Sequence, residues 1–514
     1  MGTSEARDGP PESRPGNPPE RDPVLFRGLD GSSVPVPSRE LDELSRALNG
    51  EILFPGTPGF RETCEIWNGI FQRVPAALVR CRGTADVVHA IRFARSHGIL
   101  TAVKSGGHSV TGHALVEGGL VLDLSPMRGV WVDPAHRVAH VQGGALLRDV
   151  DAETQRYGLA TPLGVVSKTG VAGLTLGGGY GHLRRKWGLT IDNLLGAEVV
   201  TAEGEVLEVD GDHHPDLFWA LRGGGGNFGV VTRFDYRLHP VGPRIFQIYR
   251  AYPLAAAWEI VRTAREFLVH QAPDEISAEF QFAKIPFGDA FDPSLHGKRV
   301  VLLRAVHAGT PEEGRRDLRP LLELGPFLYD RSGEMSYVDL QRYVDTGLPN
   351  GGRYYSTGLL VDRLGDDLLK ILFDEYSRVG FDQSAVTGIW HTGGAISRVP
   401  VPATPYIGRT VSFMIVIDSA WTDPSEDRAQ IAWGRNLKRQ LLERSVGTGD
   451  RGYINFQPGE DVRSEAEAAY GENIARLRRV KRLYDPSNFF RRNHNILPEE
   501  GPATDLPSTG KDVP

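Results

Sequence analysis

The stretch from Gly164 to Gly181 limits what this chain can fold into more than any other, because seven of its 18 residues are glycine. Each glycine in a regular backbone costs about 0.5–1 kcal/mol relative to alanine. A flexible linker would tolerate that cost, but Val171, Leu174 and Leu176 are interleaved with the glycines, and a solvated linker does not carry such side chains. The stretch therefore predicts a folded segment whose backbone lies against a flat ligand.

A second glycine turn, Lys104 to His113, follows a short apolar segment, residues 99–103, that predicts a strand. Gly106 and Gly107 allow a sharp turn and a close approach to a ligand. Successive backbone N–H groups in such a turn form an anion site suited to a pyrophosphate. His108 places an imidazole nucleophile beside it. Taken alone, these residues fit a tight turn with an incidental histidine equally well.

A third cluster, residues 223–229, matches the GxGxxG dinucleotide pattern through Gly224, Gly226 and Gly229. That pattern requires a strand before it and a helix after it. Here the order is reversed, because a predicted helix with Pro215 at its start precedes the cluster and a predicted strand, 230–238, follows. The order argues against a Rossmann site.

Size and composition bound the class of protein. A chain of 514 residues predicts two or three lobes. The net charge of −7 argues against a general binder of nucleic acid or of anionic membranes. Cys64 and Cys81 have no metal-site spacing, so free thiols and no metal are expected. With no secretory signal and no apolar run of about 18 residues, we expect a soluble, cytoplasmic protein.

The texture of the sequence divides the chain into five parts. Residues 1–38 and 499–514 predict disordered tails. The glycine clusters lie within 39–244, whereas 245–445 alternates helices and strands and predicts an α+β lobe with an antiparallel sheet covered by helices. A compact segment, 446–498, ends the ordered chain. Further predicted elements are a helix from Thr84 as N-cap to residue 98, strands 120–124 and 137–141, a helix 146–157, a hairpin 197–209, a strand 409–417 and helices 424–444 and 472–483.

Several motifs then occur in a fixed order: Ser105-Gly-Gly-His108, Gly170-Val-Ala-Gly173, Gly177-Gly-Gly-Tyr-Gly181, Asp192-Asn193, Gly225-Gly-Asn-Phe-Gly229 and Tyr484-Asp-Pro-Ser-Asn488. This set resembles the FAD-linked oxidases of the berberine-bridge-enzyme type, in the vanillyl-alcohol-oxidase and p-cresol-methylhydroxylase (PCMH) superfamily. The bacterial 6-hydroxynicotine oxidase subgroup is the most similar. The resemblance covers about residues 45 to 498.

The resemblance implies an α+β fold: a PCMH-type FAD-binding lobe of two subdomains, 39–244 completed by 446–498, and a substrate lobe, 245–445. It implies FAD attached covalently through His108. Many members have a second, cysteine tether, but Val166 stands at that position, so a single tether is implied. The implied cofactor-binding residues are Lys104, Ser105, Gly106, Gly107, His108, Ser109, Gly170, Gly173, Leu174, Thr175, Gly177, Gly178, Gly181, Asp192, Asn193, Leu194, Gly229, Val230, Val231, Asn493 and Asn495.

The implied reaction takes a hydride from an alcohol, sugar or amine carbon to flavin N5 and passes the electrons to O2, with release of H2O2. The substrate must also lose a proton, so a base is expected. Tyr453 resembles the base of carbohydrate-oxidising relatives, although it also fits a buried strand aromatic. His391 is a weaker candidate. Lys168 fits either a charge that favours flavin reduction or a surface lysine.

Thr169 departs from the valine or leucine common at the position that tunes oxygen access. Three alternatives therefore stay open: a flavin dehydrogenase with poor O2 reactivity, a flavin-binding protein without turnover, and a reductase supplied by a pyridine nucleotide. The missing Rossmann order weighs against the last of these. The oligomeric state is not predicted, and the expected partners are a small-molecule substrate and O2.

Overall fold

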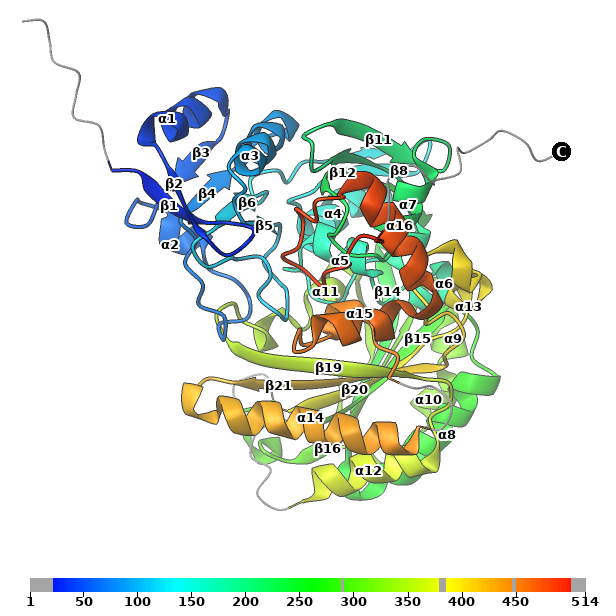
Figure 1. The fold of residues 1–514 in the computed structure, drawn as a ribbon. Coiled ribbons are helices and arrows are strands. Elements are labelled where there is room, and N and C mark those ends of the chain that lie inside the picture. The colour runs from blue at the N-terminus through cyan, green and yellow to red at the C-terminus, as the bar shows by residue number, and fades with distance from the viewer. Residues whose placement is uncertain (1–21, 288–290, 379–384, 446–449, 501–514) are drawn as a thin grey trace, which may run out of the picture.

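The structure is a computed structural model that describes residues 22–287, 291–378, 385–445 and 450–500. Figure 1 shows two lobes. The first lobe contains the N-terminal half of the chain and its C-terminal helices, and the second contains the middle of the chain. Within the described ranges, no helix has the length and apolar character that crossing a membrane requires.

One half of the first lobe is a four-stranded sheet. Its strand order is β3 (Glu51–Leu53), β4 (Ala77–Arg80), β6 (Leu120–Asp123), β5 (Thr101–Lys104), with β4 and β5 parallel to β6. Helix α3 (Thr84–Ser96) connects β4 to β5, as a right-handed crossover between parallel strands requires. The predicted capping by Thr84 is wrong: Gly83 is the N-cap, and the Thr84 hydroxyl donates instead to Glu198, 2.6 Å away.

The expectation of a disordered tail through residue 38 is wrong for its described part. β1 (Val24–Arg27) and β2 (Ser33–Val36) form an antiparallel hairpin, and helix α1 (Ser38–Ala47) follows directly. Phe26 and Val36 are buried in one cluster with Ile99 and Phe489. These few apolar residues are separated by polar and proline residues, so the sequence showed no clear strand periodicity. Residues 1–21 lie outside the described ranges.

The other half of the first lobe is a five-stranded antiparallel sheet. Its order is β11 (Val206–Asp210), β10 (Leu194–Val200), β12 (Val230–Arg237), β8 (Val138–Gln142), β7 (Val130–Asp133). Helices α4 (Leu147–Thr154), α5 (Val171–Gly177) and α7 (Pro215–Leu221) pack on it. The C-terminal helices α15 (Val462–Tyr470) and α16 (Ile474–Tyr484) return to this lobe, where Leu477 and Val480 join the same core as Leu217.

The second lobe is built on an eight-stranded antiparallel sheet. Along the main path the order is β17 (Tyr329–Asp330), β14 (Arg244–Pro253), β16 (Arg299–His307), β15 (Ile276–Lys284), β20 (Val386–His391), β21 (Phe413–Trp421), β19 (Arg353–Val361), and β18 (Gly333–Ser336) also pairs with β14. Helices α8 (Ala257–His270), α12 (Asp366–Ser377) and α14 (Asp427–Arg444) cover one face (Figure 1). The predicted α+β fold is confirmed.

Alternation along these strands gives the sheet two different faces. Phe280, Phe282, Leu303 and Ile415 point toward the helices and form the core of the second lobe. The residues between them on the strands point toward the first lobe. This second face is the one that carries the polar side chains described below.

Candidate active site

A cavity of about 1290 Å³ lies between the glycine turns of the first lobe and the open face of the second-lobe sheet. From the sheet, alternate residues of each strand line it, such as Glu279 and Gln281 on β15 and Gly388 and Trp390 on β20. Single small-molecule sites measure about 300–1,000 Å³. The cavity therefore has room for a large cofactor and a substrate together.

Most of the predicted cofactor-binding residues line this cavity. They come from turns far apart in sequence, which the fold brings together on one wall. The lining members are Ser105, Gly106, Gly107, His108, Ser109, Gly170, Gly173, Leu174, Gly177, Gly229, Val230, Val231 and Asn493.

The remaining predicted cofactor-binding residues are not on the cavity wall, and the structure gives several of them other partners. Lys104 forms a buried ion pair with Asp123, 3.1 Å away, and the Thr175 hydroxyl bonds to that of Tyr236. Asp192 binds the guanidinium of the buried Arg409 through two hydrogen bonds of 2.8 Å. The others off the wall are Gly178, Gly181, Asn193, Leu194 and Asn495.

Two glycines are required because two turns touch. A Cβ on Gly106 would lie 2.5 Å from the backbone nitrogen of Gly170, and a Cβ on Gly170 would lie 2.4 Å from that of Gly106. Gly173, by contrast, has nothing within 4 Å of a Cβ position and lines the cavity. The glycines thus serve both protein packing and open space for a ligand.

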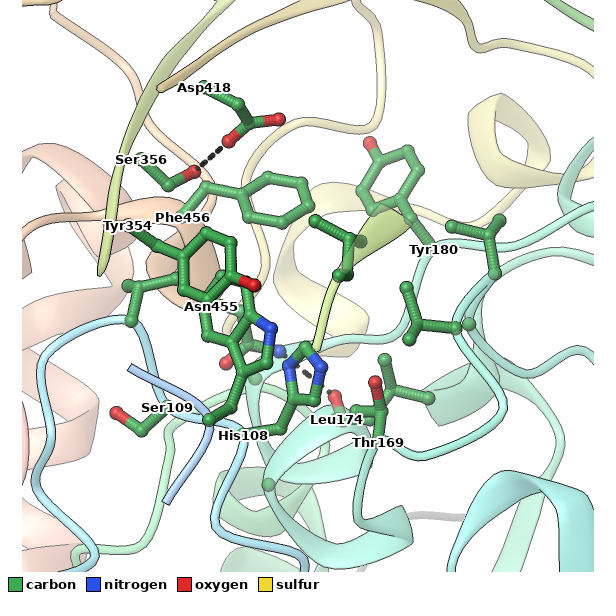
Figure 2. A pocket seen from close by; sticks show the side chains of 18 of the residues that line it. His108, Ser109, Thr169, Leu174, Tyr180, Tyr354, Ser356, Asp418, Asn455 and Phe456 are labelled. Carbon is green, nitrogen blue, oxygen red and sulfur yellow. Dashed lines mark hydrogen bonds between the residues drawn. The ribbon is translucent and has the colours of Figure 1, made fainter. Parts of the chain in front are cut away.

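His108 lies in the centre of the cavity wall with its ring held by aromatic stacking (Figure 2). Its ring centroid is 4.4 Å from that of Trp67, at an interplanar angle of 12°, and Trp67 stacks in turn on Tyr354 at 3.9 Å. The His108 Nε2 atom is buried and has no hydrogen-bond partner. Burial lowers the pKa of His108 to about 4. The ring is therefore neutral at physiological pH, and Nε2 can act as a nucleophile.

Tyr453 also lines the cavity, and its hydroxyl oxygen accepts two hydrogen bonds. The backbone N–H of Gly179 and the side-chain amide of Asn455 each donate to it at 2.9 Å. Its ring packs edge-on against Tyr180, with centroids 5.1 Å apart. Burial raises the pKa of Tyr453, while the two donors act in the opposite direction.

The two other predicted catalytic residues do not line the cavity. Trp390 on β20 faces the cavity, so strand alternation turns His391 toward the opposite face, where its ring lies 5.4 Å from that of Phe413. Burial lowers the pKa of His391. Lys168 lies on the loop before Gly170, close enough for its charge to lower the pKa of His108 slightly.

The loop that carries Val166 and Thr169 forms part of the same wall. The neighbouring Ser167 anchors it to the second lobe, because its backbone N–H and hydroxyl donate to Asp345 at 3.0 and 2.5 Å. The chain's only cysteines, Cys64 and Cys81, are free thiols that do not line the cavity.

The Tyr-Asp-Pro-Ser-Asn motif has a structural explanation. Asp485 forms a fully buried ion pair of 2.7 Å with Lys481 and accepts the backbone N–H groups of Phe489 and Phe490. This knot fixes the turn after α16, so that the following loop reaches the cavity with Arg492, Asn493 and His494.

Sequence reasoning missed four residues of the cavity wall: Trp67, Tyr354, Ser356 and Asp418. Ser356 and Asp418 are paired across β19 and β21, and the Ser356 hydroxyl donates to the carboxylate at 2.6 Å. A carboxylate within the apolar strand Phe413–Trp421 was a usable signal. The predicted strand, 409–417, stopped one residue short of it.

Comparison with known proteins agrees with this architecture. Residues 75–210 match the model of the FAD binding domain, and residues 452–497 match that of berberine and berberine-like proteins. An FAD-linked oxidoreductase of Dictyostelium discoideum is 30% identical over 463 residues, which is 89% of this chain and 97% of that protein. The chain belongs to this family of FAD-linked, berberine-bridge-like oxidoreductases.

Two further relatives are nicotine-oxidising enzymes by name. The (R)-6-hydroxynicotine oxidase of Paenarthrobacter nicotinovorans is 30% identical, over 88% of this chain and 98% of that protein. The crystal structure of 6-hydroxy-D-nicotine oxidase from Arthrobacter nicotinovorans superposes with a TM-score of 0.76 at 28% identity, covering 88% and 98% of the two chains. The predicted family, the enzyme class and FAD as cofactor are confirmed.

The residues present in this FAD-linked oxidoreductase fit the cofactor. The cavity has the size for it, Gly173 leaves open space on the wall, and the glycine turn beside His108 supplies backbone N–H groups. The orphaned Nε2 of His108 is a buried polar atom that needs a partner.

Proposed function

We propose that this FAD-linked oxidoreductase is an oxidase that carries its FAD on a single covalent bond through His108. The observation that supports the bond most directly is the buried, unpaired Nε2 on a ring held by the Trp67 stack. Val166 stands on the wall where a second tether would be needed, and its side chain cannot form one.

In this proposal the turns at 105–109, 170–177 and 229–231 and the loop with Asn493 hold FAD, and the second lobe, 245–445, holds the substrate. FAD supplies the acceptor for the two electrons and the hydrogen that leave a carbon of the substrate. The described residues orient the substrate and receive its proton.

Tyr453 is the residue we propose for the proton. It lies on the wall between the lobes, and the N–H of Gly179 and the amide of Asn455 stabilise negative charge on its oxygen. A substrate O–H or N–H would give its proton to this oxygen while hydrogen leaves the adjacent carbon. His391 has no such access, because it points away from the cavity.

The electron acceptor is proposed to be O2, with H2O2 as product. A dehydrogenase with poor O2 reactivity is the second candidate, favoured by the polar Thr169 on the cavity wall. The nature of the substrate carbon, in an alcohol, a sugar or an amine, is left to the measurement that follows.

The test has two steps on the purified holoenzyme. A panel of alcohols, sugars and cyclic amines is mixed with the protein without oxygen, and bleaching of the flavin absorbance identifies a substrate. Air is then admitted and H2O2 is measured. Rapid return of colour with stoichiometric H2O2 is expected; slow return, with fast return on adding an artificial electron acceptor, would establish the dehydrogenase instead. No bleaching by any class would contradict the proposed oxidation.

A further inference from the structure

Asp418 is a carboxylate on the substrate side of the cavity that the reaction described above does not use. It lies in the middle of β21, opposite Ser356 on β19 and Val386 on β20. The side chain lines the cavity and is partly exposed to it. Oδ1 accepts the Ser356 hydroxyl, whereas Oδ2 accepts no hydrogen bond from the described residues.

No cation of the described chain forms an ion pair with Asp418. On the cavity face its neighbours across the sheet are Ser356 and Val386, and its neighbours along β21 are Val416 and Ala420. Burial raises the pKa of Asp418 to about 6, against the hydrogen bond from Ser356. The carboxylate is therefore largely ionised at pH 7.

The other acidic residue of the lining, Glu279, is in a different situation. It lies 3.5 Å from the guanidinium of Arg304 and accepts the Gln281 amide at 3.1 Å. Register places Arg304 three strands and four residues from Asp418, a backbone separation of about 20 Å. Arg304 therefore neutralises Glu279 and leaves Asp418 unpaired.

Aromatic side chains surround the space next to Asp418. Figure 2 draws Phe456 and Tyr354 between the Asp418–Ser356 pair and His108. Tyr354 is two residues from Ser356 on the same face of β19, and it continues through Trp67 to the His108 ring. An unpaired carboxylate beside aromatic faces has the composition of a site for an organic cation, because charge attraction and the ring quadrupoles act together.

We infer that the substrate carries a positively charged ammonium group, which Asp418 and the aromatic side chains beside it bind. This inference rests on the proposed function, since it takes the cavity between the lobes as the substrate site. Asp418 acts by holding the charged nitrogen toward the second lobe, so that the rest of the molecule extends toward the His108 side of the cavity.

The test is a binding measurement that does not depend on turnover. Three probes of similar size but different charge, benzyltrimethylammonium, benzyl alcohol and phenylacetate, are titrated into the holoenzyme by calorimetry and by the flavin difference spectrum. The cation is expected to bind at least tenfold more tightly than the other two. Equal binding of the three probes, binding of phenylacetate as the tightest, or no binding of the cation would overturn the inference.

Three variants test the residue. Asp418→Asn keeps the shape but removes the charge and should bring the three dissociation constants within about threefold of one another. Asp418→Glu keeps the charge and should retain the preference. Glu279→Gln removes a paired negative charge from the same cavity and should change the cation's Kd less than threefold. A preference retained in Asp418→Asn would overturn the inference.

Each sample is first checked for acid-stable flavin and for its melting temperature. Protein that carries the flavin but shows no cation preference contradicts the ammonium site alone. Protein without covalent flavin contradicts the proposed function, whatever the probes do, so the two failures are distinguishable.

Discussion

At the scale of single residues, Tyr453 is acted on by opposing effects. Complete burial disfavours its phenolate and raises its pKa, while hydrogen bonds from Gly179 and Asn455 favour the phenolate. Burial dominates, so the phenol is protonated at neutral pH. The anion is therefore scarce at neutral pH but, where it forms, a strong base.

This balance gives a prediction for Tyr453→Phe, which keeps the ring and its packing. Flavin loading should be unchanged, and stopped-flow reduction should slow by about 10²–10⁴-fold, the contribution of a positioned general base. Because the pKa is raised, the phenolate fraction grows with pH across the neutral range. The ratio of parent to variant rate should therefore increase from pH 7 to pH 9, and comparison of rates on one substrate cancels the substrate's own titration.

A reduction rate in Tyr453→Phe within about threefold of the parent would remove Tyr453 from the reaction. Asn455→Ala is the matched variant. It removes one of the two donors and leaves the tyrosine, so it should slow reduction less than Tyr453→Phe does.

At the scale of elements, what the sequence predicted depends on how the signal is carried. Strands such as β12 and helices such as α12 carry continuous apolar patterns and were predicted close to their observed bounds. β21 was predicted too early, because Asp418 interrupts its apolar run and Arg409 was counted within it. Arg409 is instead a buried cation that binds Asp192 of the first lobe, and a contact 217 residues away in sequence leaves no local signal.

The site was predictable to the same degree. The glycine turns and His108 lie in contiguous motifs, so the cavity wall of the first lobe could be predicted from sequence. Trp67 and Tyr354 are single aromatics whose stacking on His108 depends on the tertiary fold. The substrate side could not be predicted, because it is made of alternate residues on several strands.

The β1–β2 hairpin provides a prediction at this scale. Phe26 is buried and Leu25, next to it, is 62% exposed. Phe26→Ala should lower the free energy of unfolding by about 3–5 kcal/mol, the usual cost of removing a buried aromatic side chain. Leu25→Ala is the control and should change it by no more than about 0.5 kcal/mol.

Chemical denaturation followed by tryptophan fluorescence measures both variants. Equal stabilities for the two would mean that the hairpin is not part of the folded core, as the sequence alone suggested.

At the scale of the whole molecule, the two lobes have separate tasks. The first presents backbone and His108, and the second presents one face of a sheet whose other face is sealed by α8, α12 and α14. The sheet can therefore change its cavity-facing residues without disturbing its own core. This arrangement predicts that specificity and cofactor attachment are separable.

A chimera tests that separation. Residues 245–445 are replaced by the corresponding segment of (R)-6-hydroxynicotine oxidase. The chimera should keep acid-stable flavin and should gain reduction by (R)-6-hydroxynicotine, measured by anaerobic bleaching. Loss of covalent flavin from a chimera that is folded by circular dichroism would show that the second lobe also determines attachment.

The central claim is a single covalent bond between His108 and FAD, and intact mass spectrometry of acid-denatured protein tests it most directly. The parent should have the mass of the polypeptide plus one FAD, with the flavin on the tryptic peptide that contains His108. His108→Ala, whose fold is checked by its melting temperature, should have the mass of the polypeptide alone. Parent protein at the bare polypeptide mass, or flavin retained by His108→Ala, would contradict the account.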